Sequence, residues 1–216
     1  MLNETLTWIE FPRLLFNTPA LMSAPKGNGD RVLVFPGFGA GDSSTSALRR
    51  YLTWLGYDAA GWDVGRNDGD VMALIDALTQ RTQIEARERG EKVTLIGWSL
   101  GGYLAREVAR ELPDAVQQVI TLGSPIVGGP KYTQVAAAFG DNDMLDWIER
   151  EVEARDRIPL RVPVTAIYSK FDGVVSWQAC IDHKSADVEH IEVRTTHIGL
   201  GFSPDVYRII ANRLAG

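Results

Sequence analysis

Short apolar stretches alternate with amphipathic stretches along most of this chain. The strand-like stretches have β-branched or alternating hydrophobic residues and cover 31–35, 57–61, 92–96, 116–121, 162–168 and 188–193. Between them, hydrophobic residues recur at helical spacing over 45–55, 68–90 and 100–110, and again from residue 203 or 204 onward. Strands that alternate with helices predict an α/β fold, with a mostly parallel central sheet and helices on both faces.

Capping residues give the expected helix boundaries. Ser43 or Ser44 is expected to cap the helix over 45–55. The next helix is expected to begin at residue 68 or 70 and to end at Gly90. Residues 126–160 break the alternation, and their pattern predicts two short helices, over 132–139 and from Met144 onward.

The run Gly-Trp-Ser-Leu-Gly at 97–101 lies between a predicted strand and a predicted helix. This is the context of a nucleophile elbow, a sharp turn that exposes a serine hydroxyl. The turn is so tight that the residues two before and two after the serine need almost no side chain, which accounts for Gly97 and Gly101. Ser99 is therefore a candidate nucleophile, although a glycine turn with a serine helix cap would leave the same pattern.

A serine hydroxyl needs a histidine to take its proton and a carboxylate to orient that histidine. The chain has three histidines. His183 lies in a charged stretch and His190 lies within a predicted strand, whereas His197 follows the last predicted strand in a loop. This position makes His197 the candidate base, with a buried structural histidine as the alternative.

The candidate acid is Asp172, on the loop that follows the strand over 162–168. As part of an Asp-Gly turn, Asp172 could also be only a turn former. However, neighbouring parallel strands end at the same edge of a sheet, so the loops of Asp172 and His197 should lie side by side. The order Ser99, Asp172, His197 matches the nucleophile–acid–base order of the α/β-hydrolases.

On these residues the chain resembles an α/β-hydrolase, and more narrowly the small bacterial lipase- and esterase-like serine hydrolases. The resemblance runs from about residue 31 to the last residue and is most specific in 34–39, 97–102, 121–125, 172–175 and 196–200. Many members have His-Gly where this chain has Pro36-Gly37, a departure that keeps the backbone donor. The resemblance implies an oxyanion hole formed by the amides of Phe38 and Leu100, and a short lid insertion over 126–160.

The lid would place apolar side chains around the acyl group of a substrate. Candidate pocket residues are Trp98, beside the serine, and Phe139 and Trp147 in the insertion. The same insertion residues could instead pack on the sheet. Because the insertion is short, a shallow pocket for short or medium acyl chains is expected.

A glycine-rich turn after a strand also occurs in nucleotide-binding proteins. A Walker loop needs a lysine after its last glycine, and none is present in this turn. A dinucleotide fingerprint needs a glycine where this chain has Asp42, whose carboxylate would repel a pyrophosphate. No cofactor is therefore expected.

Composition is consistent with one globular domain over residues 1–216, of which 45% are hydrophobic. The net charge of −6, with both signs interspersed, disfavours nucleic acid as a partner. The single cysteine, Cys180, excludes an intrachain disulfide, and the histidines show no metal-ligand spacing, so no metal is expected. The oligomeric state is open.

The first residues are acidic where a signal peptide would be basic, and no apolar run approaches a membrane span. A cytoplasmic location is therefore expected. Residues 8–22 are rich in large hydrophobic side chains and are interrupted by Pro12 and Pro19. This arm either packs on the core or contacts a lipid surface.

The predicted function is hydrolysis of a small-molecule carboxylic ester through an acyl-enzyme on Ser99, with His197 as base and Asp172 as acid. Two alternatives remain at this stage. An acyltransferase would use the same triad with an alcohol in place of water, and a catalytically silent binding protein could share the fold.

Overall fold

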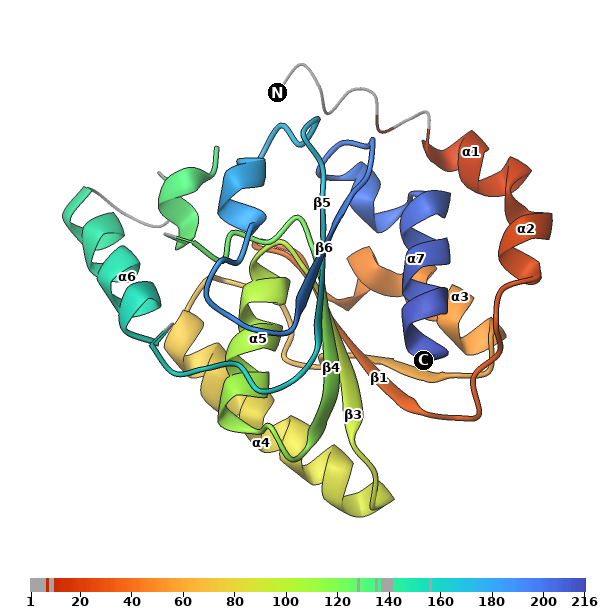
Figure 1. The fold of residues 1–216 in the computed structure, drawn as a ribbon, viewed down its shortest axis with the longest axis horizontal. Coiled ribbons are helices and arrows are strands. Elements are labelled where there is room, and N and C mark those ends of the chain that lie inside the picture. Colours follow the sequence, from red (N-terminus) through yellow and green to blue (C-terminus); the bar gives the residue numbers. More distant parts are fainter. Residues whose placement is uncertain (1–6, 8–9, 128, 135, 137–141, 156) are drawn as a thin grey trace.

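A single parallel sheet forms the centre of the molecule (Figure 1). The computed structural model describes residues 7, 10–127, 129–134, 136, 142–155 and 157–216. Six strands follow the order β2-β1-β3-β4-β5-β6, and each of these pairings is parallel. The strands are β1 (Arg31–Phe35), β2 (Asp58–Gly61), β3 (Val93–Trp98), β4 (Val116–Leu122), β5 (Val164–Tyr168) and β6 (Val188–Glu192). The α/β fold with a mostly parallel sheet is confirmed.

Helices cover both faces of this sheet (Figure 1). One face carries α1 (Glu10–Phe16), α2 (Thr18–Met22), α3 (Ser46–Trp54) and α7 (Pro204–Leu214). The other face carries α4 (Val71–Arg89), α5 (Leu100–Glu111) and α6 (Asn142–Arg155). Short 3-10 turns lie at Asp42–Thr45, Gly129–Tyr132, Trp177–Cys180 and Gly199–Gly201.

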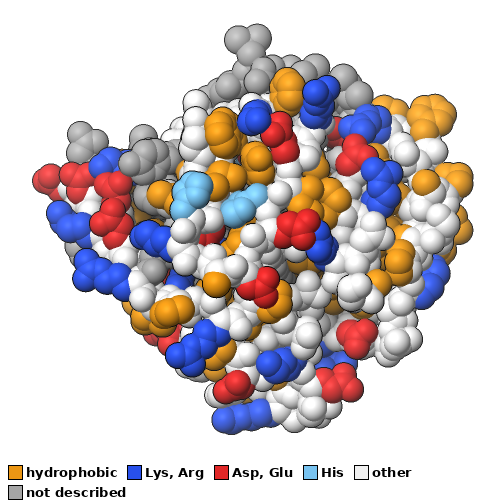
Figure 2. Space-filling view, viewed as in Figure 1, with side chains coloured by type: hydrophobic (Ala, Val, Ile, Leu, Met, Phe, Trp, Pro, Cys, Tyr) orange, Lys and Arg blue, Asp and Glu red, His pale blue; other side chains and the backbone are white. Residues whose placement is uncertain are grey.

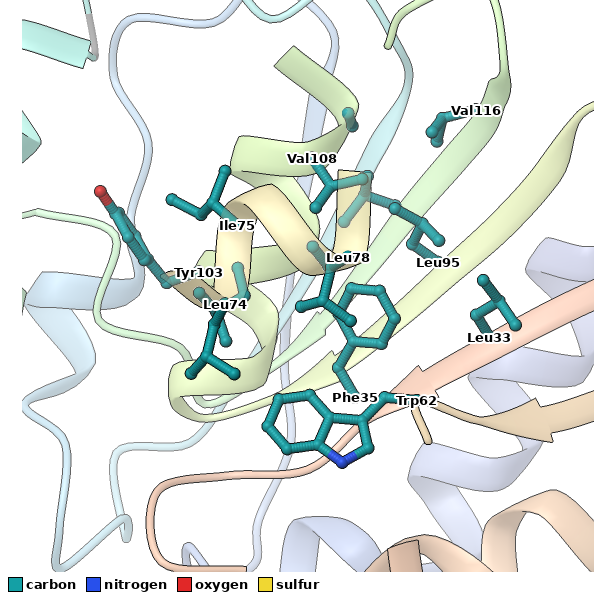
Figure 3. Packing of buried hydrophobic residues seen from close by; sticks show 14 of the residues in the cluster. Leu33, Phe35, Trp62, Leu74, Ile75, Leu78, Leu95, Tyr103, Val108 and Val116 are labelled. Carbon is teal, nitrogen blue, oxygen red and sulfur yellow. The ribbon is translucent and has the colours of Figure 1, made fainter. Parts of the chain in front are cut away.

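The alternation of side chains along the strands produces a hydrophobic core on each face of the sheet. In β1, Val32 and Val34 join the cluster under α3 and α7, whereas Leu33 and Phe35 join the cluster under α4 and α5. Figure 3 shows the second cluster, in which Leu78 of α4 lies close to the Phe35 ring. Since both faces are buried at the centre of the sheet, β1 and β3 are largely apolar, as expected for a parallel sheet, whereas the edge strand β6 carries two glutamates and a histidine.

Helix ends follow the capping rules in one case and depart from them in another. Asp70 caps α4 by accepting a hydrogen bond from the Ala73 amide, and Gly90 ends this helix with a φ of 68°. The predicted cap of α3 at Ser43 or Ser44 is wrong. Both serines lie in the 3-10 turn Asp42–Thr45, which enters the helix directly, and their hydroxyls are not at its N-cap.

Of the helix predicted over 132–139, residues 132–134 and 136 are described, and Thr133 and Gln134 bond to a neighbouring loop. Where a helix was expected from residue 132, Thr133 pairs with Val175 in an antiparallel bridge, and the Gln134 amide donates to the Val174 carbonyl at 2.8 Å. Backbone bonds to a neighbouring loop have replaced those of a helix at these residues. The second predicted helix is α6, and its Ile148 packs on the cluster around α4 and α5.

The N-terminal arm packs on the core through α1 and α2, which both contact α7. Leu21 is buried there beside Tyr207. On the outer side, Leu15 and Phe16 are 75% and 86% exposed, and hydrophobic side chains gather on this part of the surface (Figure 2). Within the described residues, no helix is both long enough and apolar enough to cross a membrane.

Candidate active site

Ser99 lies on a strained turn between β3 and α5. Its φ of 55° and ψ of −123° are unfavourable for any residue with a side chain. The neighbouring glycines permit the turn. A Cβ on Gly97 would lie 2.2 Å from the Gly101 carbonyl oxygen, and a Cβ on Gly101 would lie 2.4 Å from the Phe35 carbonyl oxygen. The backbone geometry expected of a nucleophile elbow is therefore present.

The glycine-rich loop after β1 passes directly beside this serine. A Cβ built on Gly37 would lie 3.2 Å from the Ser99 Cβ and 3.9 Å from its Oγ. Leu100 is the first residue of α5, so its amide has no carbonyl partner within the helix. Phe38 and Leu100 thus lie on two segments next to Ser99, and the oxyanion hole formed by their amides stays a prediction.

Asn67, which the sequence did not single out, holds that loop in place. Its side chain is fully buried, and Nδ2 donates to the Pro36 carbonyl at 3.0 Å. The Asn67 backbone adds two bonds, accepting from the Gly39 amide at 2.7 Å and donating to the Ala40 carbonyl at 2.8 Å. The loop is therefore clamped by residues that follow β2.

Asp172 and His197 form a hydrogen-bonded pair, as their positions after β5 and β6 predicted. Asp172 Oδ2 lies 2.7 Å from His197 Nδ1, and the two side chains are 2% and 9% exposed. The second carboxylate oxygen, Oδ1, accepts hydrogen bonds from the amides of Val174 and Val175, both at 2.8 Å. Both oxygens of Asp172 are thus engaged, which leaves the carboxylate a single orientation.

Ser169 connects the two loops that carry this pair. Its hydroxyl is buried, donates to the Thr195 carbonyl at 2.6 Å and accepts from the Phe171 amide at 3.0 Å. Thr195 and Phe171 each lie close in sequence to one member of the pair. Nothing in the sequence pattern distinguishes this serine, because its role depends on the approach of two separate loops.

Gly123, at the end of β4, gives the pair the space it needs. A Cβ at this position would lie 2.9 Å from Asp172 Oδ2 and 3.2 Å from His197 Nδ1. The φ of Gly123 is also positive, at 56°. Any larger residue there would push against the hydrogen bond between Asp172 and His197.

Trp98 lies between the elbow and the histidine loop. Its indole N–H donates to the His197 carbonyl at 3.1 Å, and its ring packs edge-on against Phe202. Because Trp98 directly precedes Ser99, this bond brings the loop of His197 against the turn that carries Ser99. Of the other candidate pocket residues, Phe139 lies outside the described residues, and Trp147 is placed in α6 by its backbone alone.

His190 of β6 and Asp182 of the β5–β6 connection belong to a separate network. His190 Nε2 accepts a hydrogen bond from the Asp182 amide, and the Asp182 carboxylate pairs with Arg106 of α5. Burial disfavours the Asp182 carboxylate, but hydrogen bonds from Ser185 and Lys184 and the charge of Arg106 outweigh it and hold its pKa well below the usual range. This network ties α5 to the connection without reaching the elbow.

His183, Asp146 and Cys180 are three further side chains of types that can act as base, acid or nucleophile. His183 is exposed, and Asp146 of α6 pairs with Lys131 on the surface. Burial raises the pKa of the Cys180 thiol, so the thiolate needed for nucleophilic attack is disfavoured. Among the described residues, no three His, Cys, Asp or Glu side chains gather as a metal site would need.

Residues 8–173 match a family model described as the alpha/beta hydrolase fold. The chain belongs to this family. The matched range covers more than half of the chain and includes Ser99 and Asp172, whereas His197 lies beyond its end. The parallel sheet and the strand–turn–helix around Ser99 agree with this family match.

Among curated members, a pimeloyl-[acyl-carrier protein] methyl ester esterase of Nitrosomonas europaea is 28% identical over 102 residues, which are 45% of this chain and 38% of that protein. Solved structures with the same fold include a monoacylglycerol lipase of Paleococcus ferrophilus, with a TM-score of 0.65 and 15% identity over 89% of this chain and 96% of that one. Lipase BlEst2 of Bacillus licheniformis has a TM-score of 0.66 and 16% identity over 89% of this chain and 94% of its own. This protein is thus an alpha/beta hydrolase with esterase and lipase neighbours.

Proposed function

We propose that this protein hydrolyses a carboxylic ester through an acyl-enzyme on Ser99. The observation that carries the proposal is the Asp172–His197 pair, joined at 2.7 Å and held by Trp98 against the turn that presents Ser99. A serine on a strained turn, a buried imidazole and an orienting carboxylate are the groups required for nucleophilic acyl transfer.

In the proposed reaction, Ser99 Oγ attacks the acyl carbon and His197 accepts the serine proton. Since Nδ1 of His197 is bonded to Asp172, Nε2 is the nitrogen that takes this proton. The carboxylate stabilises the imidazolium that forms, and the amides of Phe38 and Leu100 stabilise the oxyanion. His197 then protonates the leaving alcohol, and water releases the acid through the same groups.

For the substrate, we propose a small ester with a short or medium acyl chain. The relatives named above include a methyl ester esterase and a monoacylglycerol lipase, whose substrates share an ester bond. In the described part of the insertion that would cover the acyl group, the α-helix is α6, of 14 residues. A cover of this size buries little surface, so each added methylene should help only until the pocket is full.

The test combines a fluorophosphonate label with a series of nitrophenyl esters of increasing acyl length. Wild-type protein should be labelled on Ser99 and should hydrolyse the esters, whereas Ser99→Ala should lose nearly all of both activities and remain folded. Comparable hydrolysis by Ser99→Ala would refute the proposal. Absence of labelling in the wild type would indicate a silent binding protein instead.

A further inference from the structure

Two side chains at the start of the chain, Thr7 and Glu10 of the N-terminal arm (here residues 7–22), contact the loop that carries His197. Thr7 and Glu10 are both buried, although the remainder of α1 is largely at the surface. Their partners are Thr195 and Thr196, the two residues that directly precede His197, at separations of 185 and 189 positions in the sequence.

Glu10 makes the stronger of these contacts. Its Oε1 accepts a hydrogen bond from Thr195 Oγ1 at 2.8 Å. Arg13 Nη1 donates to both carboxylate oxygens, at 2.9 and 3.0 Å, and Arg13 Nη2 pairs with Asp205 of α7 at 2.7 Å. A buried carboxylate is costly unless it is paired and hydrogen-bonded, and Glu10 satisfies both conditions. The carboxylate is therefore fixed on α7 and presented to Thr195.

The two threonines have further contacts that make the loop rigid. Thr196 Oγ1 lies 2.6 Å from Thr7 Oγ1 and accepts from the Gly199 amide at 3.0 Å. A Cβ on Gly199 would lie 2.2 Å from Thr195 Oγ1, so the threonine hydroxyl occupies a closely packed position. Thr195 is held on its other side by Ser169 of the acid loop.

We propose that Glu10 is a positioning residue for His197 and acts through Thr195. The segment between β6 and the turn at Gly199–Gly201 has no strand or helix conformation, so side-chain bonds determine its orientation. In this arrangement the arm holds one side of the histidine loop and Ser169 holds the other. The inference rests on the proposed function of His197 as the base.

The test is a double-mutant cycle on Glu10 and Thr195. Thr195→Val removes the hydroxyl with little change in volume, and Glu10→Ala removes its acceptor. Each should lower kcat by about tenfold with KM nearly unchanged, because a displaced base slows the chemical step. The double variant should lose no more than either single variant, since both remove the same contact. Thr195→Ser, which keeps the hydroxyl, should restore kcat.

Tyr51→Phe is the matched control. It removes the hydrogen bond that the Tyr51 hydroxyl donates to the Leu21 carbonyl of the arm, at 3.3 Å, but leaves Glu10, Arg13 and Thr195 in place, so kcat should stay close to wild type. Assays are run well below the melting temperature of each variant. Equal losses of kcat in Tyr51→Phe and Thr195→Val, or losses in Glu10→Ala and Thr195→Val that multiply in the double variant, would overturn the proposal.

An NMR measurement without substrate distinguishes a failure of this inference from a failure of the proposed function. The proton between His197 Nδ1 and Asp172 should give a low-field NMR signal in the wild type. This signal should broaden or shift in Thr195→Val and return in Thr195→Ser. An unchanged signal in Thr195→Val together with unchanged kcat would show that the contact is only structural. Failure of the proposed function would appear as an unlabelled wild type, whatever the NMR result.

Discussion

Asp172→Asn should leave the fold intact and strongly reduce turnover, for a reason set by the surroundings of this side chain. Asparagine has one acceptor oxygen and one NH₂ donor in place of two equivalent oxygens. In the preferred orientation its oxygen would keep the two bonds from the amides of Val174 and Val175. Its NH₂ group would then donate to His197 Nδ1, which forces the proton of the neutral imidazole onto Nε2. A protonated Nε2 cannot accept the proton of Ser99.

The expected loss follows from the cost of the opposite orientation. To present its oxygen to His197, the asparagine would have to turn its NH₂ group toward the amides of Val174 and Val175, leaving two buried donors without an acceptor. Each such donor costs about 1–3 kcal/mol, so the productive state lies about 2–6 kcal/mol higher. This corresponds to a kcat lower by roughly 30- to 3 × 10⁴-fold.

The assay is hydrolysis of a short-chain nitrophenyl ester, with circular dichroism and thermal melting to confirm folding. The imidazole tautomer can be read from the ¹⁵N shifts of His197. Asp146→Asn and Asp182→Asn are the controls, because each removes a carboxylate engaged elsewhere, by Lys131 and by Arg106. Activity of Asp172→Asn within a few-fold of wild type, or a larger loss in Asp182→Asn, would refute this reasoning.

Four further outcomes are expected. His197→Ala should abolish hydrolysis, whereas His190→Ala should retain it. Wild-type activity should fall at acidic pH, because a protonated imidazole cannot accept the serine proton. An inactive His190→Ala together with an active His197→Ala would reverse the assignment. Asp182→Asn should be less stable than wild type near neutral pH. Folding lowers the pKa of this carboxyl, so the stabilisation that it provides is full above the unfolded-state pKa of about 3.9 and declines as the pH falls below that value. In urea unfolding, the difference in unfolding free energy between wild type and Asp182→Asn should therefore narrow from about pH 6 to about pH 3. Gly123→Ala should reduce kcat by about tenfold or more, because its methyl group would lie 2.9 Å from the acid's Oδ2, and kcat equal to wild type would argue against that crowding. Trp147→Ala should flatten or shift the rise of rate with acyl-chain length, and an unchanged profile would remove Trp147 from the pocket.

The sequence left two interpretations of the arm over residues 8–22, packing on the core and contact with a lipid surface. Leu21 and Glu10 are buried, which supports packing on the core. Leu15 and Phe16 lie on the outer side and are exposed, so the packing of the arm on the core leaves these two side chains available to a lipid surface. Hydrophobicity alone could not separate the inner from the outer side of so short a helix pair.

The sequence by itself determined the order of strands and helices, the elbow and the edge of the sheet at which the polar loops meet. These features depend on local properties. Apolar runs of strand length alternate with helical spacing, and glycines at 97 and 101 permit one sharp turn. The Asp172–His197 contact could be anticipated because neighbouring parallel strands bring their following loops together.

Only the tertiary structure decided which residues support these groups. Asn67 clamps the loop before Phe38, and Ser169 joins the loops of Asp172 and His197, through contacts between segments far apart in the chain. At Thr133 a predicted helix gave way to pairing with Val175, because hydrogen bonds to a neighbouring loop replaced local ones. Isolated polar residues carry no periodicity, and their partners are set by the packing of the sheet rather than by their neighbours in sequence.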